Sequence, residues 1–171
     1  MTSFVALLRA VNVGGTGKLA MADLKALCEA TGFRAVRTYI ASGNVVFASR
    51  KKPATLEREL LALLGVQVVV RTAEELAAVV AHDPLRKVAD NGSRYLVTFL
   101  SRPLAAQAVR SLKAATALPE QLAVHGREVY SWHPGGLYDS PLAKALAAPQ
   151  DVVATGRNWN TVTKLLALAQ G

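Results

Sequence analysis

The order of its short apolar segments limits the folds open to this chain more than any other feature of the sequence. β-prone runs alternate with segments whose apolar residues recur at helical spacing. The first half predicts the order strand, helix, strand, strand, helix, strand over residues 4–9, 21–31, 36–41, 45–48, 53–64 and 66–70. The second half predicts the same order over residues 94–100, 103–117, 121–124, 128–132, 140–147 and 152–155. That order is typical of the ferredoxin-like, split β-α-β arrangement.

The sequence therefore predicts an α+β protein with two ferredoxin-like (β-α-β-β-α-β) halves in tandem plus a C-terminal helix. A helix over 73–81 follows the first half, and Thr72 and Glu75 have the spacing of a capping box at its start. We expect the first half, with this helix, over residues 1–81 and the second half, with the C-terminal helix, over residues 82–171. Residue identity between the halves is negligible, so the repeat is one of architecture.

Composition and the single cysteine bear on the class of protein and its compartment. The chain has 51% hydrophobic and 19% charged residues, a globular composition that excludes disordered and low-complexity proteins. The sequence contains no run of about 18 uncharged apolar residues, so no membrane-spanning helix is predicted. The amino end also lacks the basic and apolar regions of a signal peptide. Cys28 is the only cysteine and cannot form an internal disulfide. We expect a cytoplasmic protein that does not contact membranes.

The chain is strongly basic, with a formal net charge of +8 and a pI near 10.0. Such a charge attracts phosphates, nucleic acids and other anions at long range. The only tight basic run is Arg50-Lys51-Lys52, and no longer basic stripe accompanies it. We therefore favour solvation of a surface over specific nucleic-acid binding as the role of this charge.

The first candidate site is the glycine-containing segment from Asn12 to Lys18. Gly14, Gly15 and Gly17 allow backbone N–H groups to turn inward, and Lys18 can neutralise an anion at the start of the next helix. A dinucleotide-binding fold is excluded because no acidic residue closes the second strand, and the phosphate-loop spacing is absent. A generic anion-binding loop and a flexible connector both remain open.

The second candidate is the segment 155–161, which precedes the expected last helix and concentrates polar groups around one tryptophan. Arg157 can fork two hydrogen bonds to a carboxylate or phosphate. Asn158 or Asn160 can cap the helix or orient a ligand, and Trp159 can stack on a base or anchor the helix to the core. We favour the structural alternative of a cap and an aromatic anchor.

A third candidate is an aromatic face on two neighbouring strands. Alternation places Tyr95, Val97 and Phe99 on one side of their strand, and Tyr130 and Trp132 on one side of theirs. RNA-recognition modules stack bases on such faces, but their signature motif is absent here. We favour the alternative that these aromatic residues seal the two halves together.

Residues with catalytic or metal-binding chemistry form no recognisable pattern. His82, His125, His133 and Cys28 lack the spacing of metal ligands, so no metal and no cofactor are expected. No serine-nucleophile motif is present, and Cys28 lies on the apolar stripe of a helix. His133 and Asp139 flank Gly135-Gly136 and are close enough in sequence to meet. No general acid or base is otherwise indicated.

Three motifs carry a resemblance to a known family: Phe4-Val5-Ala6-Leu7-Leu8-Arg9-Ala10-Val11-Asn12-Val13-Gly14-Gly15, Tyr39-Ile40-Ala41-Ser42-Gly43-Asn44-Val45-Val46-Phe47, and Arg157-Asn158-Trp159-Asn160-Thr161-Val162-Thr163-Lys164-Leu165. Together they resemble an uncharacterised bacterial family, domain-of-unknown-function family 1697. The resemblance implies a small cytoplasmic α+β protein and brings no established activity. Gly156 stands where the family usually has Thr, and Ala10 where Gly is common.

All three motifs fall at polar positions that we expect to be rich in loops, where binding sites tend to lie on rigid scaffolds. We therefore expect a small anionic ligand, phosphorylated or nucleotide-like, to bind in a cleft between the two halves. The expected binding residues are Arg9, Asn12, Gly14, Gly15, Lys18, Ser42, Asn44, Arg157 and Asn158. A nucleic-acid-binding module and a protein-interaction or assembly protein are the alternatives, and the sequence does not specify a reaction or an oligomeric state.

Overall fold

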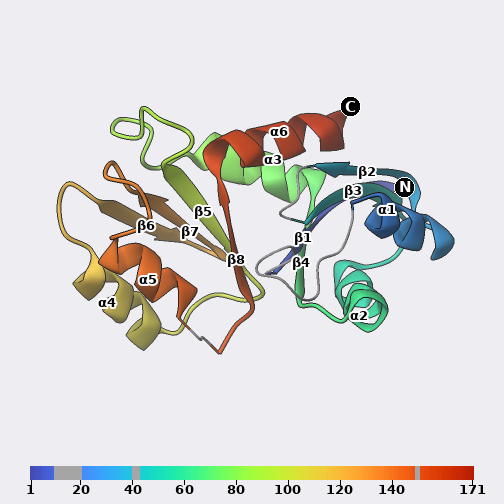
Figure 1. The fold of residues 1–171 in the computed structure, drawn as a ribbon, viewed down its shortest axis with the longest axis horizontal. Helices are drawn as coiled ribbons and strands as arrows, with labels where there is room; N and C mark the ends of the chain where they lie inside the picture. The colour runs from blue at the N-terminus through green and yellow to red at the C-terminus, as the bar shows by residue number, and fades with distance from the viewer. Residues whose placement is uncertain (10–20, 40–42, 149–150) are drawn as a thin grey trace. The chain divides into compact units, whose positions relative to one another are not determined.

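The computed structural model describes residues 1–9, 21–39, 43–148 and 151–171, with only the backbone of Met21 and Ala22 (Figure 1). These residues form two four-stranded antiparallel sheets and six helices. The α+β class expected from the sequence is confirmed. The chain forms two compact units: unit 1 is Met1–Ala78 with Lys164–Gly171, and unit 2 is Val79–Thr163.

Unit 1 contains one sheet in the strand order β2-β3-β1-β4, and every neighbouring pair is antiparallel. Its elements are β1 (Thr2–Leu8), α1 (Met21–Ala30), β2 (Arg34–Tyr39), β3 (Asn44–Ser49), α2 (Pro53–Leu64) and β4 (Val68–Thr72). Alternation along the strands directs Phe4, Ala6 and Leu8 into a core with Leu24 of α1 and Leu56 of α2. The two helices thus cover one face of the sheet.

Local sequence signals set the ends of two helices in this unit. Pro53 occupies the first turn of α2, and Gly65 ends the helix with a φ of 71°, its N–H donating to the Leu61 carbonyl. Thr72 and Glu75 form the expected capping box: the Thr72 N–H donates to Glu75 Oε1 (2.9 Å), and the Glu75 N–H to Thr72 Oγ1 (3.0 Å). This box begins α3 (Ala73–His82).

The second face of this sheet is also buried. Val5 and Leu7 alternate with the core residues of β1 and are at most 1% exposed. Ser3, on the same face, donates its hydroxyl to the Ala169 carbonyl (2.8 Å), and Arg37 donates to the Leu168 carbonyl. The last turn of α6 (Trp159–Gln170) is therefore bonded to β1 and β2.

Unit 2 repeats the order of elements in a second sheet, with strand order β6-β7-β5-β8 and antiparallel neighbours. Its elements are β5 (Tyr95–Leu100), α4 (Ala106–Ala115), β6 (Gln121–His125), β7 (Glu128–Trp132), α5 (Pro141–Ala147) and β8 (Ala154–Asn158). Leu112 of α4 and Leu142 of α5 pack with Leu100 and Val129 on one face of the sheet.

Most element boundaries differ from the expected ones by one or two residues, and the two largest differences lie in unit 2. The last strand is Ala154–Asn158 rather than 152–155, so the segment expected to be a loop before α6 is largely strand. Val152 lies before the strand and packs in the core of unit 2. Helix α4 begins at Ala106 rather than at residue 103, since Ala105 has an extended backbone (φ −63°, ψ 153°).

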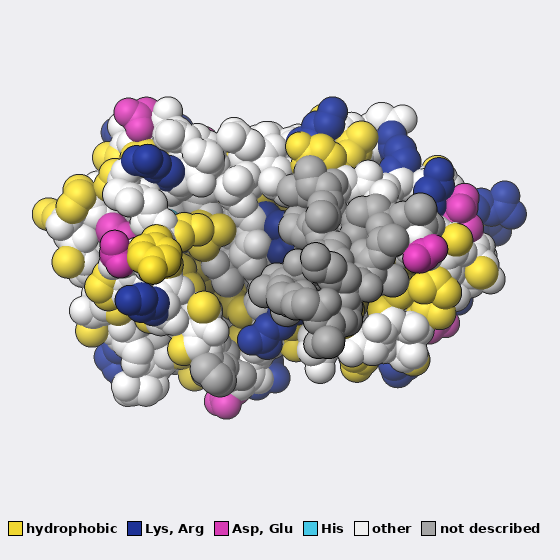
Figure 2. Space-filling view, in the orientation of Figure 1, with side chains coloured by type: hydrophobic (Ala, Val, Ile, Leu, Met, Phe, Trp, Pro, Cys, Tyr) yellow, Lys and Arg dark blue, Asp and Glu magenta, His cyan; other side chains and the backbone are white. Residues whose placement is uncertain are grey.

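No helix in the described part of the chain has both the length and the apolar character needed to cross a membrane. On the face shown in Figure 2, Lys and Arg side chains are scattered among other types rather than gathered in one stripe.

The aromatic stack in unit 1 leads to a stability prediction. Phe47 is 1% exposed and stacks on Phe33, with ring centroids 4.3 Å apart. We expect Phe47→Ala to lower the free energy of unfolding by roughly 3–5 kcal/mol because it leaves a cavity in the core. Urea unfolding followed by circular dichroism measures the loss. Tyr138→Ala is the control: Tyr138 is 91% exposed, so a change beyond about 0.5 kcal/mol is not expected there. Equal losses in the two variants would contradict the prediction.

Candidate functional site

Four of the nine expected binding residues lie in the described part of the chain: Arg9, Asn44, Arg157 and Asn158. The other five, Asn12, Gly14, Gly15, Lys18 and Ser42, lie outside the described residues. The four described residues come from two places, one in each unit.

Arg9 and Asn44 lie at the same end of the unit 1 sheet. Antiparallel pairing sets Leu7 of β1 opposite Asn44 of β3, and the Leu8 N–H donates to the Gly43 carbonyl (2.9 Å). The Arg9 side chain is exposed. Asn44 is fully buried, and its Nδ2 donates to the Tyr39 carbonyl (2.9 Å), which ties the two strands of the hairpin together. Sheet pairing thus brings the first two family motifs side by side. The Asn44 side chain is used for a hydrogen bond within the hairpin.

Arg157 lies on β8, opposite Val97 of β5. Ala154, three residues earlier on β8, packs against the helix-facing core. Because side chains alternate along a strand, Arg157 is directed to the other face of the sheet. Only 7% of the residue is exposed. Its Nη1 donates to Thr155 Oγ1 (2.7 Å) and to the Gly156 carbonyl (2.9 Å). Burial lowers the pKa of the guanidinium to about 10, because the charged form loses solvation.

The residues that follow Arg157 join β8 to α6. Asn158 Oδ1 accepts a hydrogen bond from the Thr161 N–H (2.9 Å), so Asn158 rather than Asn160 caps the helix. Trp159 stacks on Tyr95, with ring centroids 4.7 Å apart and planes 17° from parallel. The favoured structural alternative for this motif, a cap and an aromatic anchor, is confirmed.

A second buried arginine, Arg71, which was not among the expected binding residues, lies in the equivalent position of unit 1. Arg71 is 1% exposed on β4 and lies opposite Val5, as Arg157 on β8 lies opposite Val97. Each arginine is the penultimate residue of its strand and precedes the residue that caps the next helix, Thr72 or Asn158. The signal in the sequence is an order that both halves share: the fourth strand ends in an arginine and a capping residue, and a helix follows.

The expected aromatic face of unit 2 is buried. Tyr95, Phe99, Tyr130 and Trp132 are at most 6% exposed. The Tyr130 hydroxyl donates to the Val79 carbonyl (3.0 Å), and the Tyr95 hydroxyl contacts Asp83 Oδ1 (3.0 Å). Burial raises the pKa of both phenols. These rings are therefore packing groups in this unit rather than an open platform for bases.

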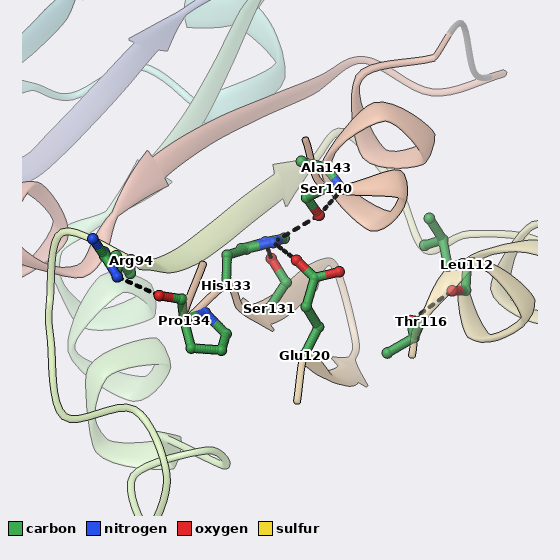
Figure 3. A network of polar contacts seen from close by, with 9 residues as sticks. All are labelled: Arg94, Leu112, Thr116, Glu120, Ser131, His133, Pro134, Ser140 and Ala143. Atoms are coloured by element: carbon green, nitrogen blue, oxygen red, sulfur yellow. Dashed lines mark hydrogen bonds and ion pairs between the residues drawn. The ribbon is translucent and has the colours of Figure 1, made fainter. Parts of the chain in front are cut away.

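A buried polar network at His133 was not foreseen. His133 is fully buried beyond the end of β7; its Nδ1 lies 2.8 Å from Glu120 Oε2 and 3.1 Å from Ser140 Oγ (Figure 3). Its Nε2 lies 2.7 Å from Ser131 Oγ. An ionised Glu120 only accepts hydrogen bonds, so we assign a proton to Nδ1; in a neutral ring Nε2 then accepts from Ser131.

Glu120 occupies the place that sequence proximity suggested for Asp139, whose side chain is exposed. The signal was in the hairpin register. Gln121 pairs with Trp132, so counting one residue outward sets Glu120 opposite His133. Ser131, His133 and Glu120 are thus bonded in the sequence of groups that activates a serine nucleophile in some hydrolases. Ser131 is fully buried, however, and therefore not accessible to a substrate.

A hollow of about 470 Å³ lies beside this network in unit 2. Its wall combines residues from the end of α4, the connection to β6 and the start of β6: Lys113, Thr116, Leu118, Glu120, Gln121 and Leu122. Glu120 belongs both to the hollow and to the His133 network. No group of three or more His, Cys, Asp or Glu side chains suited to a metal ion is found among the described residues. Cys28 is fully buried, and burial raises its pKa to about 11, consistent with a core residue.

The comparisons with known proteins concern fold and family. A model of the family described as "Protein of unknown function (DUF1697)" matches residues 1–130. The structure is similar to that of a conserved bacterial protein from Streptococcus pneumoniae, with a TM-score of 0.80 and 23% sequence identity over 98% of each chain. At that identity the likeness shows the fold. No curated protein matches the chain.

The two asparagines of the third motif give a paired prediction. We expect Asn158→Ala to lower the free energy of unfolding by about 1 kcal/mol, because the Thr161 N–H loses its cap. Asn160→Ala is the matched control and should change stability by less than half as much, since the Asn160 side chain is exposed. Thermal and urea unfolding of both variants measure the difference. A larger loss for Asn160→Ala would show that the cap is assigned to the wrong residue.

Proposed function

The chain belongs to the DUF1697 family of proteins of unknown function, and from this premise we propose that it binds a small anionic ligand, phosphorylated or nucleotide-like, at a site that includes Arg157. The observation that carries the proposal is the burial of this guanidinium on β8. A buried charge has lost much of its hydration, and an anion that contacts it restores favourable electrostatic energy. The net charge of +8 adds long-range attraction for the same ligands.

The wider site expected from the sequence adds Arg9 and Asn44 of unit 1. The exposed side chain of Arg9 is available to an anion at its end of the sheet. That Arg9 and Arg157 contact one ligand in a cleft between the halves remains a prediction, as do the roles expected for Asn12, Gly14, Gly15, Lys18 and Ser42.

Two finer statements about the molecule belong to the same proposal. We infer that each unit has the ferredoxin-like topology, because a split β-α-β arrangement predicts that the second strand neighbours the third, the third the first, and the first the fourth. The strand orders β2-β3-β1-β4 and β6-β7-β5-β8 support this inference. We also propose a cytoplasmic location, supported by the single, fully buried thiol of Cys28.

Two observations favour a small ligand over nucleic acid. The aromatic residues that an RNA-recognition module would use for stacking are buried here. Within the only tight basic run, Lys51 pairs with Glu59 (2.8 Å), so part of its charge is offset. The remaining alternative, an assembly protein, predicts a mass in solution that rises with concentration.

The test measures binding of inorganic phosphate, ATP, glucose 6-phosphate and a short oligonucleotide by calorimetry, at low and high salt. We expect a phosphorylated small molecule to bind, and Arg157→Gln to weaken it by about tenfold or more, as expected when a charge-assisted contact is lost. Arg157→Lys keeps the charge without the fork and should retain part of the affinity.

Arg110→Gln is the matched control, because it removes the same charge from an exposed side chain of α4. Equal weakening by Arg157→Gln and Arg110→Gln would attribute binding to overall charge and overturn the proposed site. Preferential binding of the oligonucleotide, with affinity falling steeply as salt rises, would favour the nucleic-acid alternative.

A further inference from the structure

We propose that the hollow beside Glu120 in unit 2 is a second binding site, and that it takes a small zwitterion with an apolar side chain, of the α-amino-acid class. The proposal is independent of the anion site at Arg157. It rests on the two opposite charges and the two leucines that line one hollow.

The acidic group of this site is held in place by buried partners. Glu120 Oε2 accepts from Nδ1 of His133, and His133 is in turn bonded to Ser131 and Ser140. The side chain of Glu120 is 14% exposed. A carboxylate accepts several hydrogen bonds, and in Figure 3 its other oxygen points away from His133. Glu120 therefore presents an oriented acceptor to an ammonium group, with its position set before a ligand arrives.

The basic group comes from a different element. Lys113 lies in the last turn of α4, and its exposed ammonium lines the same hollow as Glu120. Among the described residues Lys113 makes no ion pair. A ligand with one charge can pair with either Lys113 or Glu120, but not with both. A zwitterion satisfies both.

The two leucines that line the hollow indicate that the ligand has an apolar part. Leu118 is 83% exposed and Leu122 is half-buried, so a bound alkyl side chain would remove leucine surface from water. A volume of about 470 Å³ is within the range of sites that hold one small molecule. Charge and shape together point to a free amino acid with a branched or linear alkyl side chain.

The test compares four probes by two-dimensional NMR of the amide groups of Thr116 and Gln121. L-leucine carries both charges and the alkyl group; 3-methylbutylamine lacks the carboxylate, 4-methylpentanoate lacks the ammonium, and glycine lacks the side chain. We expect saturable shifts with L-leucine and an affinity about tenfold or more weaker for each of the other three, since each loses one favourable contact. Equal shifts with all four probes, or none with L-leucine, would overturn the proposal.

Variants test the two charges separately. Lys113→Gln and Glu120→Gln should each weaken binding of L-leucine by about tenfold, whereas Lys144→Gln, on an exposed side chain of α5, should not change it. Since Glu120→Gln alters the contact with His133 as well, Lys113→Gln, an exposed position, is the decisive variant. Unchanged binding in Lys113→Gln would reject the site. Arg157→Gln should leave L-leucine binding intact, which separates this result from the proposed anion site.

Discussion

Both sheets of this protein have to be covered on both faces, and most of the structure follows from that constraint. The central strands β1 and β5 carry apolar residues at odd and even positions, so exposing either face would leave a large apolar surface in water. In each unit a pair of helices covers one face. Contacts to the second faces come from the end of α6 in unit 1, and from the end of α3 and the first residue of α6 in unit 2.

The second faces hold the two buried arginines, Arg71 and Arg157. A guanidinium buried on a sheet face needs hydrogen-bond partners, and Arg157 has them in the side chain and backbone of its own strand. The same position of the other unit holds Arg71. An arginine before the capping residue is thus a repeated feature of the fourth strand. The proposed anion site at Arg157 is therefore built on an element that both units share, and not on a loop found in one of them.

The His133 network shows a different use of burial. One imidazole connects the residue before β6, the end of β7 and the start of α5 through Glu120, Ser131 and Ser140. Ser140 also caps α5, its hydroxyl accepting from the Ala143 N–H (3.0 Å). A network with every member bonded restrains its surroundings. The hollow therefore has a restrained carboxylate at Glu120, and its lining also includes the exposed side chain of Lys113.

Local chemistry determined much of the fold from the sequence alone. The order of elements, the limits of α2 at Pro53 and Gly65, and the capping box at Thr72 follow from spacing and backbone preferences within a few residues. The cap after Arg157 was likewise interpreted correctly, because Asn158 bonds to the N–H of a residue three positions away. That Trp159 anchors the helix was also expected, but its stacking partner, Tyr95, is distant in sequence.

Contacts between distant segments were decided only in the tertiary structure. Val152 and Val153 have the same β propensity whether they form a strand or pack in a core, so the limits of β8 required the pairing with β5. The partner of His133 is Glu120, 13 residues away across a hairpin, rather than the nearby Asp139. Sequence order sets α6 after the second half, yet its last turn bonds to β1 and β2, because apolar faces are buried by whichever segment the folded chain brings to them.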